Sequence, residues 1–347
     1  MSFGSSNVII TKSKAVYSTT LKEKELLGLS EKKSLPEFIL GLKALPQFAE
    51  TLASVPEQII RRAQLEDLLK KISYRQVLKI VKFAEGKYRP FYFQKIMNLE
   101  IDYLLSLFRH FLAQDEDSFK PIDDIPVFVQ QHASLPFKAL AEVKDFETLK
   151  DILLTTRFAK VLQPFLNYPI TDFPYTELEQ AFNVFQYRDI FHHIQTLFSG
   201  NEKKNLMMMY QTKLDLENLA KIYRLKKFYK AEPDTIKQVL FLEYSRIKLS
   251  FWEDILHIQD ADAVLTAFHS SNFSSIKDEN EYVFIEFDID KIKYNLAKRF
   301  LYFSTSAAEV FSAFTILEEI EQINLTNIIE GIRYNLDSKK IQRMLIY

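Results

Sequence analysis

The chain has 347 residues, of which 47% are hydrophobic and 14% are aromatic. This composition is too apolar for a disordered chain, and a chain of about 300 residues can bury about three quarters of its unfolded surface. The formal net charge is −1, so no long-range field attracts nucleic acid or an anionic membrane. Cysteine is absent and glycine occurs 6 times, which excludes disulfides, thiolate zinc sites and cysteine nucleophiles and disfavours glycine-rich phosphate loops.

The sequence contains no signal for membrane insertion or lipid attachment. Residues 1–14 lack the apolar core of a signal peptide, and Ser2 and Gly4 do not fit a myristoylation motif. No run approaches about 18 uninterrupted apolar residues. We therefore expect a soluble, cytoplasmic protein that needs another subunit to hold it at a membrane.

Apolar residues recur at spacings of three and four along most of the chain, which predicts an all-α fold. Ser34 followed by Pro36 predicts a capped helix start, and Asp337 precedes a last predicted helix over residues 339–346. Residues 282–287 alternate like a short strand. We favour a helix there, because the corresponding parts of the chain have helical patterns, and keep the strand as the alternative.

Two proline-containing stretches predict breaks between helical parts. They are residues 119–126, with two prolines, and residues 231–234, with one. They divide the chain into three segments of similar length, residues 1–118, 119–231 and 232–347, which we predict to be related helical repeats.

One strongly helical stretch recurs near the end of each segment, at residues 100–109, 215–224 and 321–330. A second mark, a phenylalanine after an apolar helix, recurs at Phe48, Phe158 and Phe273. Both marks are spaced about 110 residues apart, which is typical of an internal repeat. Chance similarity between amphipathic helices is the alternative explanation.

On a helix, the recurring stretch has two apolar stripes with a polar strip between them. The strip contains the following residues, with the third set departing from the other two: Asp102, Ser106 and Arg109; Glu217, Lys221 and Arg224; Ile323, Asn327 and Glu330. It is either a solvated face with ordinary pairs four residues apart or a surface that binds a partner.

Asn218 and Asn324 fall near the second apolar stripe. A buried amide must find hydrogen-bond partners or cost about 1–3 kcal/mol. We favour a structural role in which these amides fix how helices dock, and the alternative is that they face a polar cavity or a partner.

Motifs for catalysis and metal binding are weak. None of the six histidines belongs to a His-Glu-x-x-His or Glu-x-x-His motif, and Asp189 with His193 provides only two ligands. Neither Asp123-Asp124, between prolines, nor Asp288-Ile289-Asp290 has the spacing of a magnesium-binding Asp-Asp-x-x-Asp helix. We therefore predict no catalytic residue, cofactor, metal, small-molecule substrate or nucleic-acid partner.

Residues 214–226 resemble the acidic–x–x–Asn–Leu–x–x–Ile–x–Arg–x–Lys helix of the C/d-subunit family of V-type and A-type rotary ATPases. Residues 318–325, Gly331 and residues 336–341 resemble the C-terminal end of that family. The resemblance extends over essentially the whole chain. Tyr103 stands where the motif has Asn, Glu330 where it has Arg and Ile332 where it has Lys, so equal use of the polar strip in all three segments is in doubt.

The resemblance implies a funnel of three pseudo-threefold-related helical segments and a non-catalytic role in a central stalk. In this role the chain is a socket that links a rotating shaft to the membrane proteolipid ring and transmits torque for proton or sodium transport. It would lie on the cytoplasmic face of the membrane through other subunits and would need no cofactor. The expected partner-binding residues are Asp102, Arg109, Glu217, Lys221, Arg224 and Asn327.

The alternative function is a helical-repeat scaffold that binds other partners. Repeats of such scaffolds usually span 33–47 residues, which is shorter than the spacing of about 110 residues found in this chain.

Overall fold

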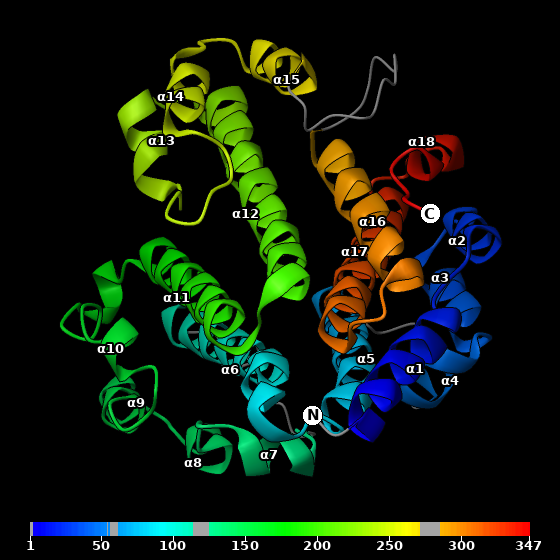
Figure 1. The fold of residues 1–347 in the computed structure, drawn as a ribbon, viewed down its shortest axis with the longest axis horizontal. Helices are drawn as coiled ribbons and strands as arrows, with labels where there is room; N and C mark the ends of the chain where they lie inside the picture. The colour runs from blue at the N-terminus through cyan, green and yellow to red at the C-terminus, as the bar shows by residue number, and fades with distance from the viewer. Residues whose placement is uncertain (1–2, 54, 56–61, 114–124, 271–284) are drawn as a thin grey trace. The chain divides into compact units, whose positions relative to one another are not determined.

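The structure is a computed structural model that describes residues 3–53, 55, 62–113, 125–270 and 285–347. Every regular element in these ranges is helical (Figure 1), which confirms the predicted all-α fold. The chain forms two compact units, Met1–Phe83 with Ser199–Tyr347, and Ala84–Phe198. This division by contacts does not test the three sequence segments, which remain a prediction.

The first unit joins the beginning and the end of the chain. Its helices are α1 (Phe3–Ser18), α2 (Glu23–Ser30), α3 (Leu35–Lys43), α4 (Pro46–Leu52), α5 (Arg62–Val81), α12 (Gly200–Tyr229), α13 (Pro233–Val239), α14 (Leu249–His257), α15 (Ala261–Ser270), α16 (Ile285–Phe303), α17 (Ala307–Arg333) and α18 (Ser338–Gln342).

The second unit is built around two long helices that pack on each other, α6 and α11. Its elements are η1 (Gly86–Tyr88), α6 (Arg89–Ala113), α7 (Val127–His132), α8 (Phe137–Ala141), α9 (Phe146–Leu153), α10 (Ala159–Leu162), η2 (Ile170–Asp172) and α11 (Tyr175–Leu197). Phenylalanines fill much of its core: the ring of Phe108 stacks on that of Phe173 with the centroids 5.2 Å apart.

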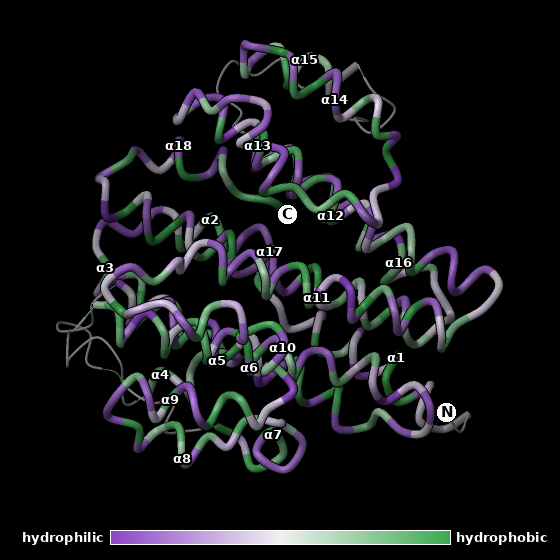
Figure 2. Tube along the Cα trace, turned by 90° about the vertical axis from the view of Figure 1, so that its left-hand side faces the viewer, coloured by the Kyte–Doolittle hydropathy of each residue, from purple (hydrophilic) through white to green (hydrophobic). Residues whose placement is uncertain are grey.

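Helix α17 is the central helix of the first unit. Residues 307–318 are all buried, because α16, α1, α5, α2, α3 and α12 pack around this helix. Most of these residues are apolar, as expected of a helix inside a core, and the polar ones among them, Glu309, Ser312, Thr315 and Glu318, are buried as well. The other long helices interleave polar and apolar residues (Figure 2), as expected of helices with one buried face.

The predicted helix boundaries agree with the structure at the caps. The Ser34 hydroxyl accepts the N–H of Glu37 at 3.4 Å and caps α3. Pro233 opens α13 after α12 has ended. Residues 285–287 begin α16, so this part of the alternating stretch is helical, whereas 282–284 lie outside the described residues. Residues 119–124 of the first predicted break and Phe273, the third of the recurring phenylalanines, also lie outside the described residues.

The last predicted helix was too long, since α18 ends at Gln342 and not at residue 346. The cause is a buried contact with α17. The amide of Asn324 donates to the Ile346 carbonyl at 2.7 Å, and its carbonyl oxygen accepts the Ile346 N–H at 2.9 Å. The second bond uses the Ile346 N–H, which a helix extended to residue 346 would need for its own backbone bond.

Asn218 on α12 makes the same pair of bonds. Its amide nitrogen donates to the Phe241 carbonyl at 2.8 Å, and its oxygen accepts the Phe241 N–H at 3.2 Å. Both asparagines are buried. The structure therefore supports the structural interpretation of these two amides, in which each fixes a chain segment about 22 residues further along.

The apolar stripes of the recurring stretch are buried as predicted. Leu325, Ile328 and Ile329 pack in a core cluster with residues from α2–α5. The corresponding residues of α12 pack in a second cluster with residues from α13–α16. In both places, a long helix therefore uses the same stripes to pack against a group of other helices.

Replacing Asn324 by Ala should lower the free energy of unfolding by about 1–3 kcal/mol, because it leaves the buried Ile346 backbone groups unpaired. Urea unfolding measures this change. Asn327→Ala is the control, since Asn327 is partly buried and its amide makes one bond, to the Met344 carbonyl at 3.1 Å. Equal effects of the two substitutions would contradict the assignment.

Gly331 lies where α17 passes α18, and a Cβ built there would stand 2.5 Å from Cγ1 of Ile341. Alanine is favoured over glycine inside a helix by about 1 kcal/mol. We nevertheless expect Gly331→Ala to lower the melting temperature, because Ile341 must shift. Adding Ile341→Ala should make the glycine substitution neutral or stabilising, and a stabilising single substitution would show that no close contact exists.

Candidate functional site

A groove of about 630 Å³, lined by charged and apolar residues, lies between α12, α16 and α17 in the first unit. Its lining includes Glu217, Lys221 and Arg224 from α12 and Asn327 from α17, together with Met344 and Ile346. Four of the six predicted partner-binding residues therefore gather around one groove. They come from two different copies of the recurring stretch.

The third wall of the groove is α16, which contributes charged residues that the sequence analysis did not select. Glu286, Asp290 and Lys293 line it, and they lie four and three residues apart on one face of the helix. This spacing was visible in the sequence. The sequence did not single it out, because residues 282–287 alternate like a strand and α16 lies outside the recurring stretch.

Four of the charged residues around the groove form two ion pairs, one between helices and one within α16. Nε of Arg224 lies 2.6 Å from Oε1 of Glu286, which links α12 to α16. Nζ of Lys293 lies 2.5 Å from Oδ1 of Asp290 on α16. Since three acidic and three basic residues line the groove, its net charge is small, and six apolar residues, among them Met344 and Ile346, share its lining.

Burial shifts the protonation of two groups in the groove. It raises the pKa of Asp290, although nearby Lys293 acts in the opposite direction. It also lowers the pKa of Lys221, which Glu217 partly offsets. Both groups are therefore held in an environment where an unpaired charge is costly.

A further ion pair joins α12 to α17. Nζ of Lys213 lies 2.6 Å from Oε2 of Glu319. Burial alone would lower the pKa of Lys213, but the carboxylates of Glu319 and Glu217 outweigh it and raise the pKa above its ordinary value. Lys213 thus stays charged and holds the two helices together.

The other two predicted residues lie on α6 in the second unit and are not among the residues that line this groove. Arg109 donates from Nε to the Tyr175 hydroxyl at 2.8 Å, and its guanidinium lies over the Tyr175 ring, 5.5 Å from the centroid. That hydroxyl donates in turn to the Leu105 carbonyl at 3.3 Å. Asp102 is exposed on the same helix.

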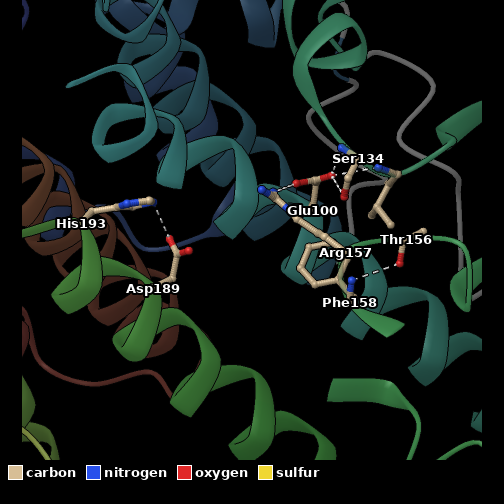
Figure 3. A network of polar contacts seen from close by, with 8 residues as sticks. Glu100, Ser134, Thr156, Arg157, Phe158, Asp189 and His193 are labelled. Atoms are coloured by element: carbon tan, nitrogen blue, oxygen red, sulfur yellow. Dashed lines mark hydrogen bonds and ion pairs between the residues drawn. The ribbon is translucent and has the colours of Figure 1, made fainter. Parts of the chain in front are cut away.

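Asp189 and His193 contact each other between neighbouring turns of α11 (Figure 3), with Nε2 of His193 3.3 Å from Oδ2 of Asp189. Across the described ranges, no three His, Asp or Glu side chains gather closely enough to hold a metal ion. None of the described helices combines the length and apolar character that a bilayer-spanning helix requires.

Replacing Lys293 by Met would leave Asp290 without its cation, and both side chains are largely buried. Breaking a buried pair on one side costs about 3–5 kcal/mol. We expect the cost to be smaller at pH 5 than at pH 8, because the carboxyl group is more easily protonated at the lower pH. Urea unfolding at both values measures it, and Asp290→Asn in the Lys293→Met background should recover part of the loss.

Comparison with known protein families matches residues 9–344 to the ATP synthase (C/AC39) subunit family. Comparison with curated proteins found no match. The family match extends over both compact units and includes all three helices around the groove. The chain therefore belongs to the ATP synthase (C/AC39) subunit family.

Proposed function

We propose that this chain is the non-catalytic socket of a central stalk in a V-type or A-type rotary ATPase. Three related helical segments would form a funnel that receives the end of the shaft. The other side would sit on the proteolipid ring, at the cytoplasmic face of the membrane. The chain would then transmit torque between ATP turnover and the movement of protons or sodium ions.

The groove between α12, α16 and α17 is the observation that carries this proposal. It gathers Glu217, Lys221, Arg224 and Asn327 from two copies of the recurring stretch. Its charges are balanced, so it suits a partner that is recognised by polar complementarity and shape rather than by net charge. A shaft helix with side chains of both signs fits this description.

Transmission of torque requires that the socket deform little under load. Two ion pairs tie α12 to its neighbours, from Arg224 to Glu286 on α16 and from Lys213 to Glu319 on α17. The extensive contact of α17 with α16 and α1 adds a packed core behind them. These contacts support a rigid wall for a bound shaft.

Affinity purification of the chain from its native membrane in mild detergent tests the proposed role. Recovery of shaft subunits and a proteolipid ring would support the socket. Recovery of neither would favour the alternative, a helical-repeat scaffold with other partners.

A charge-swap series tests the groove itself. Arg224→Glu should weaken binding to purified shaft subunits by about tenfold or more, which corresponds to about 1.4 kcal/mol. The double variant Arg224→Glu/Glu286→Arg restores the ion pair with reversed polarity. It should keep the stability of the parent and still bind the shaft weakly, because the pattern that faces the partner is reversed.

The matched control reverses an exposed ion pair outside the groove, Lys227 on α12 with Asp262 on α15. Lys227→Glu/Asp262→Lys should leave the affinity unchanged. If the Arg224/Glu286 swap restored full binding, the residues would act only through local stability. Arg109→Glu in the same assay shows whether Arg109 contacts the shaft, and an unchanged affinity would remove it from the proposed interface.

A further inference from the structure

Two exposed aromatic residues, Phe228 and Tyr334, extend the polar strip of the recurring stretch. The next position on the same helix face lies four residues after the last strip residue. It is occupied by Phe228 at the end of α12, by Tyr334 directly after α17 and by Ala113 at the end of α6. Phe228 is 69% exposed and Tyr334 is 63% exposed. We call these two residues the strip aromatics.

A single exposed aromatic ring needs no explanation, because much of any protein surface is apolar. The strip aromatics differ from scattered rings in two respects. They share one position of a recurring pattern, and each follows strip residues that line the same groove. These lining residues are Glu217, Lys221 and Arg224 on α12 and Ile323 and Asn327 on α17. Each strip aromatic therefore continues one wall of the groove toward the C-terminal end of its helix.

The backbone holds both strip aromatics in place. Phe228 lies within the last turn of α12, and the chain turns at Lys230, whose φ is 49°. The N–H of Tyr334 keeps a helical hydrogen bond to the Glu330 carbonyl at 2.9 Å, and the chain turns at Asn335, whose φ is 52°. A left-handed residue is a common way to end a helix. Side chains on such a fixed backbone lose less freedom when a partner covers them, which lowers the cost of binding.

The groove offers apolar contacts together with its charges. Its apolar lining residues are Ala220, Phe287, Ile289, Ile323, Met344 and Ile346. Grooves of this composition bind amphipathic helices, whose apolar side chains enter the groove while the polar side chains remain on its flanks. Aromatic residues beside such a groove are the side chains that most often dominate the binding energy of an interface.

Positive charge is concentrated on the flank where α18 follows α17. The guanidinium of Arg333 lies over the Tyr334 ring, 5.2 Å from its centroid. Among residues 333–343, the exposed charged side chains are four basic and one acidic: Arg333, Lys339, Lys340, Arg343 and Asp337. At the end of α12, by contrast, Arg224 and Lys227 are each paired with a carboxylate. The complementary partner therefore carries negative charge on the α18 side.

We propose that Phe228 and Tyr334 are the apolar anchors of the socket, and that the shaft segment they hold is an amphipathic helix with net negative charge on the flank beside α18. This inference rests on the proposed function and adds the chemistry of the partner segment to it. Apolar side chains of that helix pack on the two rings, and its acidic side chains face Lys339, Lys340 and Arg343.

Binding of purified shaft subunits to the intact chain tests the anchors. Phe228→Ala and Tyr334→Ala should each weaken the affinity by about tenfold or more, as expected of aromatic anchors. Tyr334→Phe should keep the parental affinity, because the ring makes the contact. The matched control is Tyr229→Ala, since Tyr229 is 76% exposed and adjacent to Phe228 but lies off the strip. It should leave the affinity within about twofold of the parent.

The same assay at low and high salt tests the charge of the partner. Lys339→Glu/Lys340→Glu should weaken binding at low salt, and the loss should shrink as the salt concentration rises, because exposed charges are screened. The loss caused by Phe228→Ala should change little with salt. Lys138→Glu/Lys144→Glu makes the same change of charge at exposed positions of the second unit and should have the smaller effect.

The melting temperature of each variant should match that of the parent, because all the substituted side chains are exposed. If the parent binds no shaft subunit, the proposed function fails and this inference fails with it. If the parent binds and both alanine variants bind equally well, the socket stands and the anchors are overturned. Equal losses in the two double-lysine variants would overturn the acidic flank. So would parental shaft affinity in Lys339→Glu/Lys340→Glu combined with loss of binding to phosphatidylserine vesicles, which would assign α18 to a membrane.

Discussion

Polar side chains on the buried faces of the long helices must be paired, and this requirement connects the long helices to the short ones. Asn218 and Asn324 each bind both backbone groups of a residue further along the chain. Glu100, Asp215 and Glu321 each hold a backbone amide just before a short helix. Apolar burial supplies most of the stabilisation, but it is not directional. Hydrogen bonds are directional, so they determine which segment lies against each long helix.

The parts of the fold that depend on local pattern could be predicted from the sequence. The apolar stripes around Leu219 and Leu325 are buried because a spacing of three and four residues already defines a helix face. The Ser34 cap of α3 and the start of α13 at Pro233 depend on adjacent residues. The end of α18 could not be predicted this way, since the contact that stops it comes from Asn324, 22 residues earlier. Local pattern does not contain such tertiary contacts.

The candidate site shows the same limit. The polar strip correctly selected Glu217, Lys221 and Arg224 as neighbours on one helix face, and they line the groove with Asn327. A helix face does not reveal which helix packs beside it, so Glu286 and its neighbours on α16 were missed. The same reasoning treated Arg109 as equivalent to Arg224. In the structure, Arg109 binds Tyr175, whereas Arg224 binds a carboxylate on another helix of the groove.

The hydrogen bond between Leu21 and Glu321 joins residues 300 positions apart, and this separation has a consequence for synthesis. Helices α2–α5 complete their core with residues of α17, a helix that is synthesised roughly 300 residues later. At about 5–20 residues per second, roughly 15–60 s pass between the synthesis of α2–α5 and the synthesis of α17. During this interval the apolar faces of the first helices, including Phe38 and Ile39, have no native partner from the C-terminal part. In the nascent chain, these faces therefore lack that part of their core until α17 has been synthesised.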